Sequence, residues 1–260
     1  MHFEAGVTFM SHIHLPDGVI PPAWWILGFV LCFALLWLFT GRIKGDELRR
    51  KIPFAGVIAA LMLIFMSVPL GFLPVHLSLA VLCGILAGPG LSFIAIFVVN
   101  TILALMGHGG FTAIGINTLL MGGEAIAGYY LFKILSGRLS CTFSAILSNI
   151  TALLLSTALM LILVASTAGL SEVLPFHDHG QNHGEEVHFA ESKQEEELPE
   201  NYDEHKAAEA EGVKFLSITG WSAVIMIILS GIFIESLLTG LIVNFFSKVR
   251  PDFLDIVHPT

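Results

Sequence analysis

Long apolar runs with few or no charges are the feature that most restricts how this chain can fold. A helix needs about 20 mainly apolar residues to cross the ~30 Å hydrocarbon layer of a membrane. Of the 260 residues, 55% are hydrophobic and only 13% are charged, whereas a soluble domain carries about 25% charged residues. We therefore predict an all-α, polytopic integral membrane bundle of about seven transmembrane helices. The hydrophobic segments occupy residues 19–41, 53–72, 76–88, 90–107, 113–136, 141–169 and 214–247.

Two of these segments depart from a simple span. The segment 76–88 is shorter than a membrane is thick, so we expect it to start deep in the membrane or to be tilted and broken. Pro89 and Gly90 separate it from the next segment. The last segment is longer than one span requires, and we expect residues 203–215 to extend its helix out of the membrane.

The basic residues predict the orientation, because Lys and Arg in short loops are retained on the cytoplasmic side. With seven spans, nine of the twelve basic residues share one face. We therefore expect the N-terminus outside and the C-terminus in the cytoplasm, with the chain in the cell inner (plasma) membrane. The nine are Arg42, Lys44, Arg49, Arg50, Lys51, Lys133, Arg138, Lys248 and Arg250.

The same topology places a long polar loop outside. Thirteen of the 21 acidic residues lie between Glu172 and Glu211, so the net charge of −9 reflects this loop rather than the bundle. The loop is poor in large apolar residues, which predicts disorder, and its acidity argues against nucleic acid as a partner. The predicted organisation is an extracytoplasmic N-terminal segment (1–18), six spans (19–169), the loop (170–213), and a last transmembrane helix with a cytoplasmic tail (214–260).

Histidines are concentrated on the predicted outer face, and only His258 maps inside. Neutral imidazole is a preferred ligand of nickel, cobalt, zinc and copper ions. This distribution predicts binding of a divalent metal ion on the outer side. The ten outer residues are His2, His12, His14, His76, His108, His177, His179, His183, His188 and His205.

The loop offers one kind of metal site. Its histidines are spaced among acidic residues with no fixed geometry, which predicts weak and unselective gathering of divalent cations. The alternative is a solvated acidic tether whose histidines are incidental. The residues concerned are His177, His179, His183 and His188.

The outer turns offer a second kind of site. His12 and His14 precede a Pro-Asp-Gly sequence at Asp17, which predicts a turn that folds the N-terminal segment back toward the bundle. His76 lies at the outer mouth of the third span, and His108 opens a His-Gly-Gly-Phe turn. These turns would bring imidazoles together near one face. Taken singly, a histidine at a helix end can also be a plain interfacial residue.

Polar side chains inside apolar segments need partners, because burial without one is costly. We expect Asn117 to hold the outer loops by hydrogen bonds near the site, and Glu124 to be interfacial or paired. For these two and for Asn100, the alternative is a role in helix packing only. A cluster of small residues predicts a helix-packing face, which could be directed toward a partner subunit. The small residues are Gly122, Gly123, Ala127 and Gly128.

Three runs resemble a known family. The runs IHLPDGVIPPAWW, LPVHLSLAVLCGILAGP and MGHGGFTAIGINTLLMG are similar, in order and spacing, to the signature regions of the CbiM/NikM family. Members are nickel- or cobalt-specific substrate-binding (S) subunits of energy-coupling factor ABC transporters. The resemblance covers about residues 10–140. It implies a seven-helix bundle with the N-terminus outside and a nickel or cobalt ion as the transported substrate.

The resemblance also implies a ligand set. In the family, nitrogen atoms of the N-terminal segment and of a histidine before the third helix hold the metal in a near-planar site. By this pattern His14 matches the N-terminal histidine and His76 matches the loop histidine. The family histidine is the second residue of the chain, however, and His14 is not.

Two arrangements would restore a terminal amine beside a histidine. Translation can start at Met10, and removal of that residue leaves Ser11 as the terminus with His12 in second position. Alternatively, Met1 and His2 supply the amine and imidazole from a longer arm. A terminal amine next to a histidine forms fused chelate rings that suit tetragonal nitrogen geometry, so nickel is the first expected ion and cobalt the second.

The motifs that are missing narrow the function further. The sequence contains no Gly-x-x-x-x-Gly-Lys-Ser/Thr phosphate loop, so ATP-driven uptake requires cytoplasmic ATPase subunits and a coupling membrane subunit. The family also implies a small accessory membrane subunit. The sequence shows no metalloprotease or hydrolase motif, so we expect a substrate-capture subunit rather than an enzyme, with no organic cofactor. The alternative is a stand-alone divalent-metal permease or exporter with a His-rich metal-sensing loop.

Overall fold

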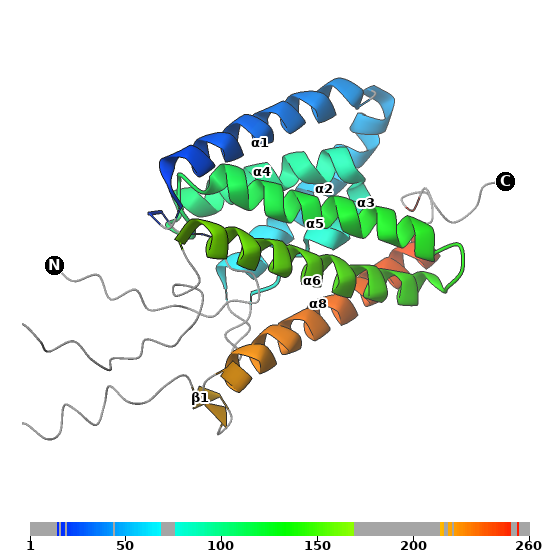
Figure 1. The fold of residues 1–260 in the computed structure, drawn as a ribbon. Coiled ribbons are helices and arrows are strands. Elements are labelled where there is room, and N and C mark those ends of the chain that lie inside the picture. Colours follow the sequence, from blue (N-terminus) through cyan, green and yellow to red (C-terminus); the bar gives the residue numbers. More distant parts are fainter. Residues whose placement is uncertain are drawn as a thin grey trace, which may run out of the picture.

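The computed structural model describes residues 15, 17–18, 20–43, 45–68, 76–168, 214–215, 218–219, 221–250 and 254, the side chains of 45–50, 167–168 and 214–224 excepted. Over these residues the chain is an all-helical bundle with one short hairpin (Figure 1). The predicted fold class is confirmed. The helices are α1 (Pro22–Arg42), α2 (Gly45–Ser67), α3 (Ala80–Ala87), α4 (Pro89–Leu105), α5 (Ile114–Leu135), α6 (Cys141–Ala168) and α8 (Trp221–Val249).

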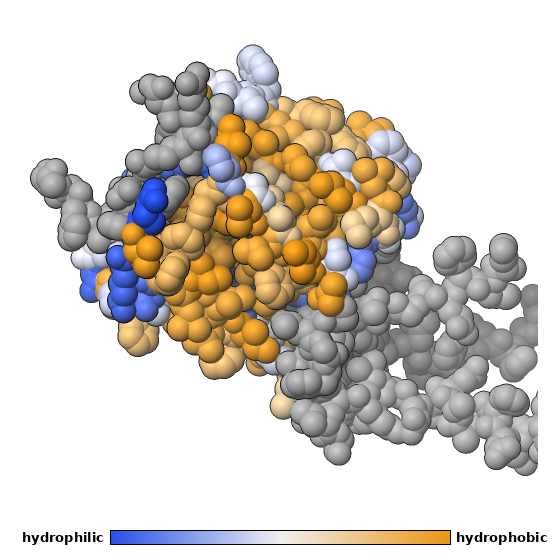
Figure 2. All heavy atoms as spheres, turned by 180° about the vertical axis from the view of Figure 1, so that it is seen from behind, coloured by the Kyte–Doolittle hydropathy of each residue, from blue (hydrophilic) through white to orange (hydrophobic). Residues whose placement is uncertain are grey.

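The outer surface of the bundle is apolar. Trp37 is 82% exposed and Phe143 is 69% exposed, and such side chains cover much of the face seen in Figure 2. An apolar exterior is stable in lipid rather than in water. Among the described residues, α1, α6 and α8 are long and apolar enough to span a membrane, and α2 and α4 contain shorter apolar stretches. The chain is therefore membrane-embedded.

Helix α5 lies at the centre of the bundle and packs against α1, α3, α4 and α6. Small residues allow this close approach. A Cβ on Gly122 would collide with the ring of Phe93 on α4, and a Cβ on Gly128 would collide with Val81 on α3. The predicted helix-packing face is therefore confirmed for Gly122 and Gly128, whose neighbours are helices of this chain rather than a partner subunit. Gly123 has open space around its Cβ position.

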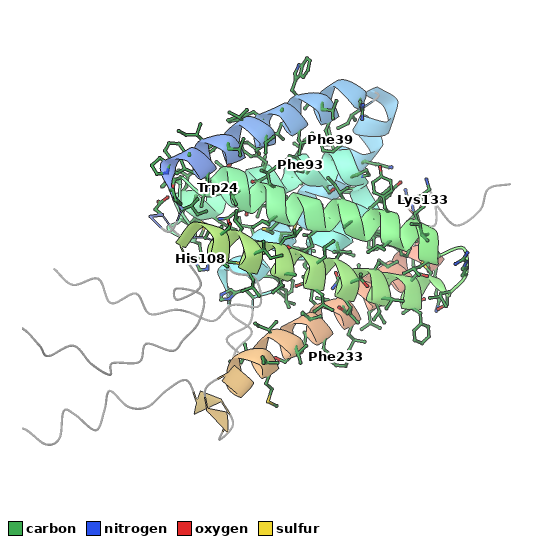
Figure 3. The ribbon with its side chains drawn as sticks, in the orientation of Figure 1. Trp24, Phe39, Phe93, His108, Lys133 and Phe233 are labelled. Atoms are coloured by element: carbon green, nitrogen blue, oxygen red, sulfur yellow. The ribbon has the colours of Figure 1, made fainter. Side chains whose placement is uncertain are left out.

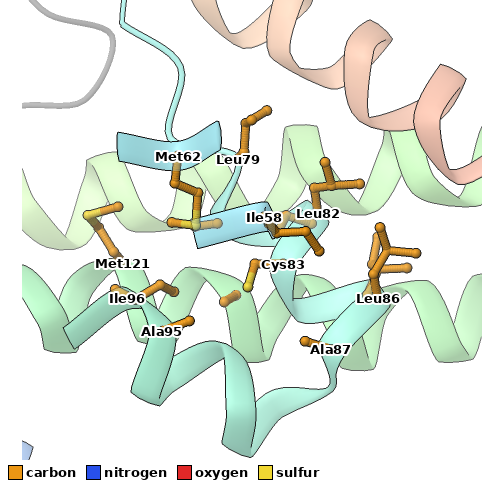
Figure 4. Close-up of a cluster of buried hydrophobic side chains, with 14 of the residues drawn as sticks. Ile58, Met62, Leu79, Leu82, Cys83, Leu86, Ala87, Ala95, Ile96 and Met121 are labelled. Carbon is orange, nitrogen blue, oxygen red and sulfur yellow. The ribbon is translucent and has the colours of Figure 1, made fainter. Parts of the chain in front are cut away.

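Helix α3 is only eight residues long, and all of them are buried. It ends at Gly88, whose φ of +84° favours glycine, and Pro89 then starts α4. The predicted separation of the third segment from the fourth at Pro89 is confirmed. The core around α3 is formed by large side chains of α2, α3, α4 and α5 (Figure 4), among them Met62, Leu82, Leu86, Ile96 and Met121.

The last helix begins later than expected. Lys214–Phe215 (β1) pairs antiparallel with Ile218–Thr219 (β2), and α8 starts at Trp221. The predicted helical extension through 203–215 is therefore wrong at Lys214 and Phe215, and residues 203–213 lie outside the described part. The Gly220 that follows the hairpin, a poor helix former, marks the boundary in the sequence.

Candidate functional site

One end of the bundle gathers several of the residues that the sequence singled out. His108 and Lys133 lie at opposite ends of the molecule (Figure 3). Four parts of the chain meet at the end where His108 lies: the residues preceding α1, His76 before α3, the turn between α4 and α5, and the start of α5. We call this the histidine end. Of the predicted site residues, it contains His76, His108, Asp17 and Asn117.

The segment before α1 is tied to α5 by Asn117. The Leu15 N–H donates to Asn117 Oδ1 at 3.1 Å, and Asn117 Nδ2 donates to the Leu15 carbonyl at 3.4 Å. The Gly110 N–H donates to the same carbonyl at 3.2 Å. Leu15 is itself buried, at 2% exposure. The hydrogen bonds expected of Asn117 are present, and they fix the backbone of the residue that follows His14.

Asp17 locks the same segment to the turn between α4 and α5. Its Oδ2 accepts from the Phe111 N–H at 3.0 Å, and its Oδ1 accepts from the Thr112 N–H at 2.8 Å and from the Thr112 hydroxyl. The Thr112 hydroxyl, followed by the two backbone N–H groups, lowers the pKa of Asp17 below its ordinary value of 3.8. A Cβ on Gly110 would collide with Asp17, so the turn needs glycine at that position.

His76 and His108 come together at the histidine end. Their ring centroids are 5.6 Å apart with an interplanar angle of 58°. A metal bound to a ring nitrogen at about 2.1 Å lies about 3.2 Å from the ring centroid, so two imidazoles on one ion have centroids at most ~6.4 Å apart. The observed separation falls within that limit. His76 is 8% exposed, and the Nε2 of His108 is buried with no hydrogen-bond partner among the described residues.

The described residues supply only part of a metal site. They contain no group of three His, Cys, Asp or Glu side chains that could hold an ion together. The remaining predicted ligands fall outside the described part, as do the loop histidines. They are His2, Ser11, His12 and His14, with His177, His179, His183 and His188 in the loop.

Sequence reasoning missed a buried carboxylate beneath the histidine end. Glu235 on α8 is fully buried and accepts hydrogen bonds from Ser78 and Leu79. Glu124 on α5, which was expected to be interfacial or paired, is paired: the Ser78 hydroxyl lies 3.2 Å from its Oε1. A lone acidic residue in a long apolar helix is the signal that could have pointed to Glu235.

Two other buried polar pairs hold helices together without reaching this site. Asn100 on α4 donates to the hydroxyl of Thr118 on α5 at 3.2 Å. Asn149 on α6 donates to the hydroxyl of Ser236 on α8 at 2.9 Å. The helix-packing interpretation of Asn100 fits this contact.

The lipid-compatible helical bundle and the imidazole pair define an integral membrane protein with residues suited to binding a transition metal. Two solved structures share its fold. A truncated transition metal transporter has a TM-score of 0.62 and 17% identity, covering 91% of this chain and 99% of its own. A second transition metal transporter has a TM-score of 0.60 and 18% identity, covering 91% and 93%.

The family is shown by the sequence itself. A profile of the CbiM family, described as the cobalt uptake substrate-specific transmembrane region, matches residues 14–253. The chain belongs to the CbiM family and is a membrane component of cobalt or nickel uptake, with a metal ion as its substrate. No curated protein of known function matches it.

Proposed function

We propose that this chain is the substrate-capture subunit of an energy-coupling factor transporter, and that it binds one nickel or cobalt ion at the histidine end. The observation that carries the proposal is the paired imidazoles of His76 and His108 beside an N-terminal segment pinned at Leu15. His14 directly precedes Leu15, so hydrogen bonds to Leu15 limit how far its imidazole can lie from this end. Rigid support of this kind is what a selective metal site requires.

Two nitrogens from the bundle and others from the N-terminal segment would complete the site. His14 and His76 are the proposed core ligands, with His108 beside them. The terminal amine comes either from Ser11, with His12 in second position, or from Met1 with His2. Intact mass of the purified protein distinguishes the two arrangements, because the first lacks residues 1–10.

The proposed ion follows from the site that the family resemblance implies. A site made only of nitrogen atoms in a near-planar arrangement favours Ni(II) over Zn(II), which prefers tetrahedral coordination. Nickel is therefore the proposed substrate and cobalt the next best. The acidic loop, through His177, His179, His183 and His188, would raise the local metal concentration without setting selectivity.

The proposed direction is uptake. Lys133, one of the nine basic residues assigned to the cytoplasmic face, lies at the end of the bundle opposite His108 (Figure 3). This favours a histidine end that faces outward. Release to the cytoplasm would be driven by ATPase subunits and a coupling membrane subunit, because this chain carries no phosphate loop.

Metal titration of the purified, detergent-solubilised chain tests the proposal. We expect one tight equivalent of Ni(II), weaker Co(II) and much weaker Zn(II), with a square-planar nickel absorption spectrum. His76→Ala should abolish the tight equivalent, whereas the control His258→Ala, at the predicted cytoplasmic end, should retain it. Weak binding of several ions that is unchanged by His76→Ala would refute the capture site.

Two further measurements separate the parts of the proposal. Deletion of residues 176–212 should leave the tight site intact, and loss of tight binding would refute the division of roles between loop and bundle. Uptake into proteoliposomes should require the partner subunits and ATP. Transport by this chain alone would instead support the alternative of a stand-alone permease.

A further inference from the structure

The stretch from His76 to Leu79 is a non-helical connection in the interior of the bundle. All four residues are buried, so their backbone N–H groups need partners elsewhere in the protein. The Leu77 N–H reaches the Phe65 carbonyl on α2 at 3.4 Å. Leu79 has a φ of +54°, in the left-handed region that a branched, bulky residue rarely adopts. Something outside the stretch must therefore hold it in this conformation.

The carboxylate of Glu235 meets this need. Its Oε2 accepts from the Ser78 N–H at 3.0 Å, and its Oε1 accepts from the Leu79 N–H at 3.0 Å and from the Ser78 hydroxyl at 2.9 Å. The Ser78 hydroxyl in turn accepts from the Ala80 N–H at 3.2 Å, at the start of α3. One side chain on α8 thus satisfies two backbone N–H groups. Together with Glu124 it also contacts the hydroxyl that binds the first N–H of α3. The two oxygens of a carboxyl group can accept several hydrogen bonds at once, and such bonds are stronger away from water.

We infer that Glu235 is a positioning residue for metal capture: from α8 it fixes the backbone two residues after His76 and thereby the place of that imidazole. This inference rests on the proposed function, since it assumes that His76 is a ligand. Glu235 itself contacts Ser78 and Leu79 and is given no role as a ligand. The arrangement connects the last helix to the capture site across more than 150 residues of sequence.

Glu235→Gln tests the inference with little change of shape. The amide group of glutamine keeps one oxygen but turns an N–H₂ toward a backbone N–H, so at least one of the three bonds is lost. Loss of such a supporting contact weakens metal binding by roughly 10- to 100-fold in other sites. We expect a loss of this size in Ni(II) affinity, measured by calorimetry well below the unfolding temperature of the variant.

Ser236→Ala is the matched control. Ser236 is the next residue on α8, is equally buried, and accepts its hydrogen bond from Asn149 rather than from the loop. We expect it to lower the thermal unfolding temperature while leaving the Ni(II) affinity near that of the wild type. If Glu235→Gln behaves in the same way, Glu235 is only structural and the inference is wrong.

A second readout does not depend on metal. Amide hydrogen exchange at Ser78 and Leu79 should accelerate in Glu235→Gln and stay slow in Ser236→Ala. Unchanged exchange would overturn the inference even if affinity fell. If Glu235→Gln does not fold, Glu235→Asp serves instead, because a side chain shorter by one methylene cannot reach both N–H groups. Absence of tight Ni(II) binding by the wild-type protein would refute the proposed function, while the exchange data would still decide whether Glu235 fixes this backbone.

Discussion

Asn117 and Leu15 form a reciprocal pair of hydrogen bonds, 3.1 and 3.4 Å long, that joins the middle of the chain to the residue after His14. The side-chain amide of Asn117 binds both the N–H and the carbonyl of Leu15, as a neighbouring β-strand would. Because Leu15 is buried, neither of its backbone groups has water as an alternative partner. Replacement of Asn117 should therefore loosen the N-terminal segment at Leu15, although the Gly110 N–H and Asp17 still hold it to the turn between α4 and α5.

Asn117→Leu keeps the approximate size of the side chain and removes both bonds. We expect Ni(II) affinity to fall by about tenfold or more, and the free energy of unfolding to fall by about 1–3 kcal/mol. Calorimetric titration and thermal unfolding in detergent measure the two effects. Asn149→Leu is the control, since it breaks a buried bond to Ser236 and should lower stability without changing affinity. Equal loss of affinity in both variants would contradict the specific role of Asn117.

Asp17 predicts a dependence of stability on pH. Its hydrogen bonds from Thr112 and Phe111 lower its pKa in the folded protein below the ordinary value of 3.8. The ionised carboxylate thus contributes stability that is fully present above pH ~4 and is lost as the pH falls through the lowered pKa. The difference in unfolding temperature between wild type and Asp17→Asn should be constant from pH 7 to about 5 and shrink below 4. A difference in unfolding temperature that grows as the pH falls would have the opposite sign and would exclude a stabilising role of the ionised Asp17.

His108 should tune the metal site more weakly than His76. Its buried Nε2 has no described partner, so an ion shared with His76 would satisfy it. We expect His108→Ala to lower Ni(II) affinity by roughly 10-fold and to alter the nickel absorption spectrum. His205→Ala, in the acidic loop, should change neither quantity. An unaltered spectrum with unchanged affinity would remove His108 from the site.

Neighbouring glycines on α5 offer a packing test. Gly122→Ala should destabilise the protein by about 1–3 kcal/mol, because the new methyl group meets the fully buried ring of Phe93. Gly123→Ala meets open space and should be neutral or stabilising by up to about 1 kcal/mol, as alanine is the better helix former. Thermal unfolding of the two variants in the same detergent gives the comparison. Similar destabilisation by both would show that the α4–α5 packing is not as described.

The sequence predicts the helices well because the length of an apolar segment and the glycine and proline residues at its ends are local properties. Segment 19–41 became Pro22–Arg42, and the short third segment and its break at Pro89 were found as expected. The hairpin at Lys214 was missed, since a two-residue pairing leaves little periodicity to detect. The packing role of Gly122 was predicted, but its neighbour Phe93 was not, because small residues indicate close packing without identifying the neighbouring helix.

In the candidate site, too, local features were predictable from the sequence and contacts between distant residues were not. The grouping of His76, His108 and Asp17 at one end of the bundle followed from spacing and turn chemistry. The partner of Asn117 did not, because the contact joins residues 102 positions apart. Glu235 was overlooked because its significance depends on what it meets in space, and Ser78 is ordinary in sequence.

The brevity of α3 has a consequence for how this span can change. Eight helical residues rise only about 12 Å, so non-helical backbone from His76 to Leu79 covers part of the depth that neighbouring helices cross with internal hydrogen bonds. Non-helical backbone at such depth is tolerated only when surrounding protein satisfies it. Because part of that support comes from Glu235, the third span depends for its local conformation on the last helix of the chain, and a displacement of α8 would be transmitted directly to the residues beside His76.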